Sequence, residues 1–156
     1  MPVDSTPGAE TAPPTSVLLI RLGSELFGVP GSAVREVTRY REPLPVPGAP
    51  QSMPGLISQR GAVLTAVDLR PLLGLPPVEP SRATRYVVAQ HEEIGIALVA
   101  DTVLDLVDLS AGSMEPLPAA LDPVRARLLQ AVARHENQLL ALLDLDALIA
   151  VLREEP

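Results

Sequence analysis

Proline is the residue that most restricts the folds open to this chain, because it occupies 18 of the 156 positions. A proline donates no backbone hydrogen bond, and its ring disrupts the interior of a helix or of a central strand. Long helices and long-stranded sheets are therefore excluded, and the sequence predicts short elements joined by stiff connections. Residues 41–50 and 75–81 are two such connections, and we expect both to run extended.

Short apolar runs separated by turn-forming residues predict β-hairpins. Four pairs of strands fit this pattern: residues 17–22 with 26–29, 55–58 with 62–67, 86–90 with 94–100, and 128–133 with 139–143. The second pair turns at Gln59-Arg60-Gly61. Residues 103–109 fit either a strand or a helical turn, so the fold class predicted from the residues is mainly β.

Capping residues predict three short helical segments. Ser32 is expected to begin a helical turn that places Val34 and Val37 three residues apart on one face. Asp68 is expected to cap a helix that ends at Gly74. Asp144 should cap a C-terminal helix, whose apolar stripe consists of Leu145, Leu148, Ile149 and Leu152.

Two segments share one pattern of a strand, a capping Asp, a Leu and then an apolar pair: residues 63–73 and residues 139–149. The offset between Asp68 and Asp144 is 144 − 68 = 76 residues, which predicts two copies of one small β-rich unit that share a groove. The second proline-rich connection suggests lobe one at about residues 16–78 and lobe two at about 82–152, with exchange of strands between lobes possible. The alternative is chance, because a strand followed by a capped helix is common. Residues 1–15 lack apolar periodicity and predict a disordered leader rich in proline and alanine.

Charge and composition exclude several classes of partner. The formal net charge is −7, and no basic run could follow a phosphate backbone, so nucleic acid is not an expected partner. The aromatic residues are Phe27, Tyr40 and Tyr86, too few for a stacking platform. Apolar runs are too short for direct membrane insertion and no export signal is present, so we expect a cytoplasmic protein.

The sequence offers no pattern for catalysis or for a cofactor. Neither His91 nor His135, both in predicted turns, has metal-ligand spacing, and the chain has no cysteine. We expect Asp101, Asp105 and Asp108 to form a solvated face. The protein is therefore not expected to be an enzyme or to bind a metal or cofactor; a carboxylate-based hydrolase is the enzymatic alternative.

Glu36 and Arg60 remain as candidates for an interaction site. Arg60 interrupts an otherwise apolar hairpin, and its guanidinium favours a planar acidic partner. Glu36 precedes the proline-rich connection that leads to this hairpin. The alternative is that Arg60 is only an exposed turn residue, in a loose surface pair that contributes at most ~1 kcal/mol.

Six short motifs resemble those of a known family in the same order: LFGVP at 26–30, VREV at 34–37, LPVPGAP at 44–50, GLISQRG at 55–61, VDL at 67–69 and LLDL at 142–145. Over residues 16–152 the chain resembles the CheW-like domain family of chemotaxis coupling proteins. The resemblance implies two packed five-stranded SH3-like β-barrels with short helices and a C-terminal helix. It also implies a non-enzymatic adaptor in receptor arrays at the inner membrane, which joins the cytoplasmic tip of methyl-accepting chemoreceptors to the regulatory domain of a CheA-type histidine kinase.

The resemblance also assigns roles to individual residues. Positions matching Val34, Glu36, Gly55 and Arg60 are associated with receptor binding, and a salt bridge between Glu36 and Arg60 fixes the hairpin. The kinase-binding edge corresponds to Val37, Tyr40 and Leu44.

This chain departs from the family pattern at Ser58-Gln59, where Asn-Leu is usual. The departure leaves two readings open. The protein either couples both partners or is a divergent member that binds only one, in a separate pathway such as gliding or pilus motility.

Overall fold

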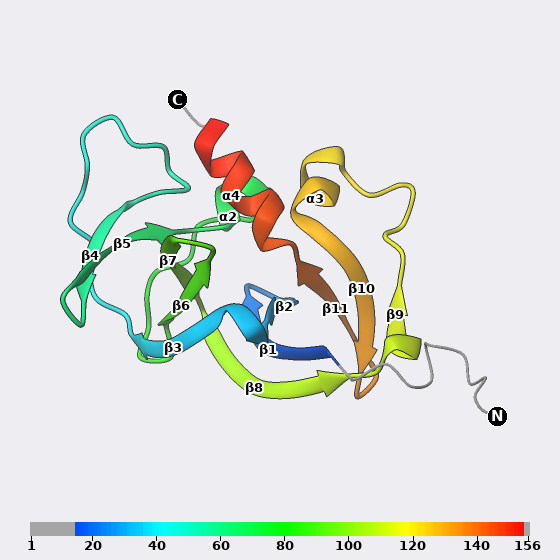
Figure 1. Ribbon diagram of the computed structural model, residues 1–156. Helices are drawn as coiled ribbons and strands as arrows, with labels where there is room; N and C mark the ends of the chain where they lie inside the picture. The colour runs from blue at the N-terminus through cyan, green and yellow to red at the C-terminus, as the bar shows by residue number, and fades with distance from the viewer. Residues whose placement is uncertain (1–14, 155–156) are drawn as a thin grey trace.

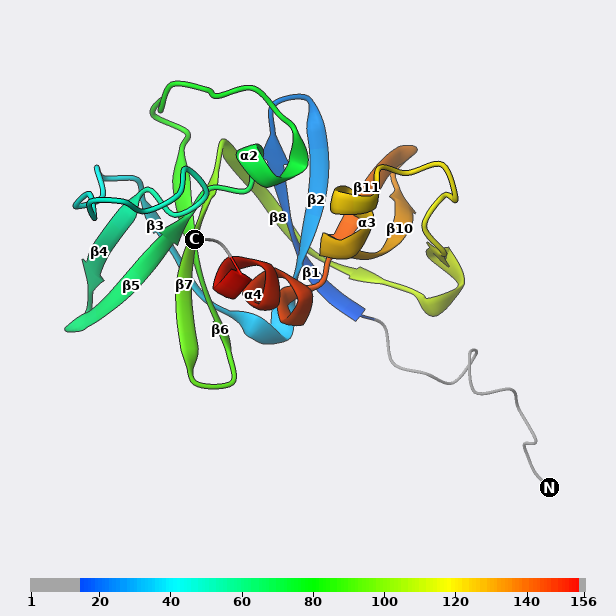
Figure 2. The same cartoon turned by 90° about the horizontal axis from the view of Figure 1, so that it is seen from above.

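The computed structural model describes residues 15–154, which form two β-sheets with short helices between and beside them (Figures 1 and 2). In chain order the elements are β1 (Thr15–Leu22), β2 (Glu25–Pro30), the 3-10 turn η1 (Gly31–Ala33), β3 (Val34–Arg39), β4 (Gly55–Gln59), β5 (Ala62–Val67), α2 (Arg70–Leu73), β6 (Arg85–His91), β7 (Ile94–Ala100), β8 (Thr102–Leu109), η2 (Ala111–Ser113), β9 (Met114–Glu115), α3 (Pro123–Leu128), β10 (Leu129–His135), β11 (Gln138–Leu143) and α4 (Leu145–Glu154). All four predicted hairpins are present. Among residues 15–154 no helix is long and apolar enough to cross a bilayer.

The strand order shows the internal repeat directly. One sheet has the order β8-β1-β2-β11-β10-β9 and the other has the order β3-β6-β7-β5-β4. In each, the strand that precedes a helix runs parallel to the second strand of a hairpin, as β11 does beside β2 and β5 beside β7. The two segments that share the capping-Asp pattern therefore occupy equivalent places in the two sheets.

The division into contiguous lobes near residue 80 does not match the sheets. Strands β3 to β7 form one sheet, while β1 and β2 pair with β8 and β11 in the other. The reason is that β3 and β8 each leave the hairpin they follow and join the opposite sheet, which is the strand exchange considered above. The six-stranded sheet exceeds the expected five because the two-residue β9 pairs with β10.

Three apolar clusters explain why the strands have apolar runs instead of strict alternation. Val17 and Leu19 of β1 belong to the core of the six-stranded sheet, whereas Leu18 and Ile20 point into the core between the sheets. Because both faces of β1 are covered, its centre is apolar throughout. The third cluster fills the five-stranded sheet. The predicted stripe of α4 is buried in the core between the sheets.

Some local predictions were wrong. The helical turn expected from Ser32 is only the 3-10 turn η1, and Val34 and Val37 lie on the strand β3, where half-buried and exposed residues alternate. A spacing of three residues fits β3 because the strand has a bulge between Val34 and Glu36. Thr15, assigned to the leader, begins β1, and residues 1–14 of that predicted leader lie outside the described residues.

The predicted caps are largely present. Asp144 accepts a hydrogen bond from the backbone N–H of Ala147 at 3.1 Å, which caps α4. Gly74 ends α2 in the left-handed conformation with a φ of 72°. Asp68 differs slightly, because Leu69 is the N-cap position and Asp68 instead accepts from the N–H of Arg70 at 3.0 Å.

Candidate functional site

A tight turn at Arg60-Gly61 joins β4 to β5. Gln59 pairs with Ala62, and Arg60 and Gly61 have φ values of 52° and 81°, which is the type I′ geometry favoured in two-residue hairpins. Glycine adopts this conformation without steric cost, whereas Arg60 is in a conformation that is uncommon for its type. The turn leaves 76% of the Arg60 side chain exposed.

The structure brings Glu36 and Arg60 together. The Arg60 Nε donates to the two carboxylate oxygens of Glu36 at 3.1 and 3.0 Å. Gln59 adds a bond from its Nε2 to the same carboxylate at 3.1 Å. Strands β3 and β4, which hold Glu36 and Gln59, are the two edges of the five-stranded sheet. These bonds therefore connect its edges and close the sheet into a barrel.

Arg41 extends this network from the other side. Its Nη2 donates to the side-chain oxygen of Gln59 at 2.8 Å and also to the backbone oxygen of Ser58. The Tyr86 hydroxyl in turn donates to the backbone oxygen of Arg41 at 2.8 Å. The amide of Gln59 thus bonds with both its oxygen and its nitrogen, which a leucine at this position could not do. Sequence analysis missed both Gln59 and Arg41 as site residues, although the family mismatch at Gln59 marked the position.

Arg60 keeps unused hydrogen-bonding capacity. Only its Nε binds Glu36, and its two Nη groups make no hydrogen bond to any of residues 15–154. A guanidinium held through Nε presents its outer edge in a fixed plane, which suits a carboxylate or carbonyl of a partner.

Gly55 is buried, and a close backbone contact leaves no room for a side chain at this position. A Cβ atom at this position would lie 2.2 Å from the carbonyl oxygen of Leu44. Leu44 lies on the proline-rich connection, which pairs with β4 through two backbone bonds to Leu56 of 2.8 and 2.9 Å. Gly55 therefore supports the connection and offers a partner no side-chain surface of its own.

The other predicted contact residues differ in accessibility. Leu44 and Val37 have 69% and 40% of their surface exposed, so both are available to a partner. Tyr40 is half-buried and stacks on Tyr86 with ring centroids 5.2 Å apart. Burial, together with the nearby Glu42 carboxylate, raises the pKa of Tyr40 above its usual value. Val34 packs against the core between the sheets.

An apolar groove lies where the five-stranded sheet meets α4. Its volume is about 170 Å³, and its apolar lining comes from Met53, Ile94, Ile96, Ile149 and Leu152. Thr65 of β5 also lines it, and Val63, two residues earlier and 70% exposed, continues the same face of β5 towards the Arg60 turn. This groove between the two units was anticipated from the repeat, but its residues were not.

A CheW-like domain model matches residues 16–153 of the chain. The chain belongs to the CheW-like family. Chemotaxis protein CheW of Rhizobium meliloti is 30% identical over 131 residues, which cover 84% of each protein. Protein FrzA of Myxococcus xanthus is 30% identical over 138 residues, covering 88% of this chain and 86% of its own.

A solved structure shows the same fold. The scaffolding protein TtCheW from Thermoanaerobacter tengcongensis superposes with a TM-score of 0.77, covering 84% of this chain and 89% of its own, at 21% identity. The mainly β architecture with two packed β units is thereby confirmed. As a CheW-like protein, the chain is a coupling adaptor for chemotaxis.

Two polar clusters of this CheW-like protein differ from expectation. Asp101 was expected in solvent, but its carboxylate pairs with the buried Arg70 and accepts from the N–H of Gly23 at 2.7 Å. It therefore links the helix α2 to the β1–β2 turn. The Nε2 of His91 lies 2.9 Å from Asp146 of α4.

His91, Glu92 and Asp146 lie close enough together to share a cation. However, both carboxylates are exposed, and His91 already contacts Asp146. Exposed acidic groups are common without a bound ion, so this cluster by itself does not indicate a metal site.

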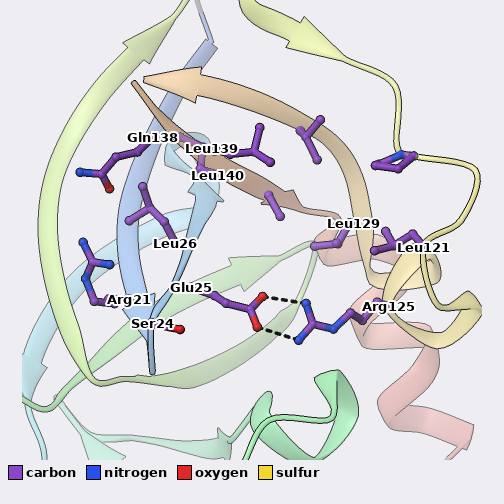
Figure 3. Close-up of a pocket in the computed structure, with 13 residues that line it drawn as sticks. Arg21, Ser24, Glu25, Leu26, Leu121, Arg125, Leu129, Gln138, Leu139 and Leu140 are labelled. Atoms are coloured by element: carbon purple, nitrogen blue, oxygen red, sulfur yellow. Dashed lines mark hydrogen bonds and ion pairs between the residues drawn. The ribbon is translucent and has the colours of Figure 1, made fainter. Parts of the chain in front are cut away.

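A larger cavity of about 460 Å³ lies beside β2, β11 and α3 (Figure 3). Its wall contains a two-pronged ion pair, in which Arg125 donates to the oxygens of Glu25 at 2.7 and 2.9 Å. These hydrogen bonds hold the pKa of Glu25 below its usual value and raise that of Arg125. Because Arg125 also donates to the backbone oxygen of Leu73 at 2.8 Å, the pair fastens α3 to both β2 and α2.

Proposed function

We propose that this CheW-like protein couples methyl-accepting chemoreceptors to a CheA-type histidine kinase by binding both, without catalysing a reaction. The observation that supports the receptor contact most strongly is the fixed Arg60 guanidinium. Glu36 orients it, and its two Nη groups are directed to no group within residues 15–154. Recruitment to receptor arrays at the inner membrane follows from this proposal.

The receptor contact combines this charge with the apolar groove. A helical receptor tip would place an apolar stripe over Ile94, Ile149 and Leu152, in the helix-in-groove mode of recognition. A carboxylate or carbonyl of the same helix would meet the outer edge of Arg60. In this arrangement Glu36 positions Arg60, and Gly55 acts only through the backbone that it supports.

The kinase contact would use a different surface, formed by exposed apolar residues. Val37 on the edge strand β3 and Leu44 on the proline-rich connection are exposed apolar residues in a fixed backbone. Tyr40 lies between them in sequence and supports this surface by packing against the barrel core. A small apolar interface of this kind fits a partner held in a multivalent array, where each contact can be weak.

Substitution of Arg60 tests the receptor contact. Arg60→Ala should abolish kinase activation in a reconstituted receptor and kinase assay while far-UV circular dichroism stays unchanged, because the exposed side chain contributes little to folding. Arg134→Ala is the matched control, since Arg134 is exposed on β10, away from the turn. Activation that survives Arg60→Ala would contradict the role given to this residue.

Separate pull-downs with a receptor cytoplasmic fragment and with the kinase regulatory domain test the number of partners. A coupling protein must bind both. Binding to only one would favour the alternative of a divergent CheW-like protein in a separate motility pathway. The similarity to a relative with another name, Protein FrzA, is consistent with that alternative.

A further inference from the structure

Three arginines, none of which takes part in the proposed coupling contacts, line one cavity. Arg39 ends β3, Arg85 begins β6, and Arg82 lies in the connection just before β6. With Tyr40, Ser81 and Thr84 they line a cavity of about 410 Å³. Within the described part of the chain, no carboxylate lines this cavity, although the protein as a whole has a net charge of −7.

The pairing of strands forces two of these charges together. Arg39 and Arg85 are directly opposite each other in the antiparallel pair formed by β3 and β6. Like charges in such positions are destabilising. None of the three arginines forms an ion pair within residues 15–154.

The guanidinium groups are also free to bind a ligand. Arg85 donates from Nη1 to the backbone oxygens of Arg82 and Thr84 at 2.7 and 2.9 Å, which holds its side chain in place and leaves Nη2 and Nε. The side chains of Arg39 and Arg82 make no hydrogen bond to any described residue. Several guanidinium groups around one concave site match the oxygens of a phosphate group.

The connection beside the arginines supplies hydroxyl donors. The Oγ1 of Thr84 accepts from the N–H of Ser81 at 2.8 Å, and the Oγ of Ser81 accepts from the N–H of Ala83 at 3.1 Å. Because both hydroxyl oxygens act as acceptors towards the backbone, each hydroxyl can donate its proton to a bound anion. The loop is thereby fixed in a shape that presents donors to the cavity.

We propose that this arginine cavity is a binding site for a phosphate group, carried either by a small molecule or by a phosphorylated side chain of a partner protein. The site shares Tyr40 with the proposed kinase contact, but its binding groups are Arg39, Arg82 and Arg85 and not the Arg60 turn. A bound phosphate would neutralise the repulsion between Arg39 and Arg85.

Titration calorimetry on the full chain at fixed ionic strength tests the proposal. The probes are pyrophosphate, ATP, a phosphoserine peptide and the same peptide with glutamate in place of phosphoserine. Saturable binding is expected for at least one phosphate-bearing probe, and the probe that binds identifies the source. Arg39→Gln and Arg82→Gln should each weaken it about tenfold or more, as expected for the loss of one charged hydrogen-bonding group. Arg134→Gln, which removes the same charge elsewhere, should leave it unchanged.

A stability measurement provides a second readout. Arg39→Gln should raise the thermal midpoint in phosphate-free buffer, because it removes the like-charge pair. The phosphate-bearing probe that binds should raise the midpoint of the wild type, and the same concentration should raise that of Arg39→Gln less. No saturable binding of any phosphate-bearing probe, equal weakening by Arg134→Gln, or equal affinity for the glutamate peptide would overturn the proposal.

Discussion

Replacement of the buried Gly55 by alanine should destabilise the protein without changing its exposed side chains. The added Cβ would lie 2.2 Å from the oxygen and 2.7 Å from the carbonyl carbon of Leu44, and both are backbone atoms that no side-chain rotation can move. The proline-rich connection must therefore separate from β4, which breaks the two backbone hydrogen bonds between Leu44 and Leu56. At about 1 kcal/mol for each of the two bonds plus about 1–3 kcal/mol for residual overlap, the expected loss is about 3–5 kcal/mol.

Urea denaturation followed by circular dichroism measures this loss, and the thermal midpoint should fall by roughly 6–20 °C. Gly112→Ala is the matched control, because a Cβ there meets no atom within 4 Å. That variant should stay within about 0.5 kcal/mol of the wild type or gain slightly from a less flexible unfolded chain. A Gly55→Ala variant as stable as Gly112→Ala would refute the steric account and return Gly55 to the list of direct contact residues.

Two further predictions concern the polar contacts. Arg125 lowers the pKa of Glu25. The pair therefore stabilises the fold fully at pH values above the ordinary carboxyl pKa of 4.5, and this stabilisation is lost as the pH falls through the lowered pKa of Glu25. Since 38% of the Glu25 side chain is exposed, the wild type should lose at most ~1 kcal/mol relative to Glu25→Gln on acidification, and parallel stability curves for the two proteins would contradict this. Tyr86→Phe removes the hydroxyl that donates to the backbone oxygen of Arg41. The free energy of unfolding, measured by urea titration, should therefore fall by about 1–2 kcal/mol. A change below about 0.3 kcal/mol would show that water replaces the hydrogen bond.

The local elements were predictable because each depends on neighbours in sequence. Two short apolar runs on either side of Gln59-Arg60-Gly61 predict a hairpin there, although Gln59 belongs to β4 and the turn itself contains only Arg60 and Gly61. An aspartate before an apolar stripe predicts the start of α4. Proline placement excluded regular structure from most of residues 41–50, where a single bridge at Leu44 is present. The ion pair between Glu36 and Arg60 was suggested by residue chemistry together with the family resemblance, and the structure places the two groups in contact.

Tertiary structure decided which sheet each edge strand joins and which polar side chains are partly buried. The residues of β3 and β8 do not show which sheet each strand joins. The loop that forms when a strand joins one sheet or the other also has nearly the same closure entropy. The partners that distinguish the choices are distant in sequence: Asp101 meets Arg70 and Gly23 only after β8 has joined β1. The same holds for Arg39 and Arg85, whose unfavourable pairing is fixed by the register of β3 with β6 and by no local pattern. Hydrogen bonds within a turn depend on neighbouring residues and can be predicted from the sequence. Hydrogen bonds between the edge strands of a sheet depend on the packing of the whole core, which aligns those strands.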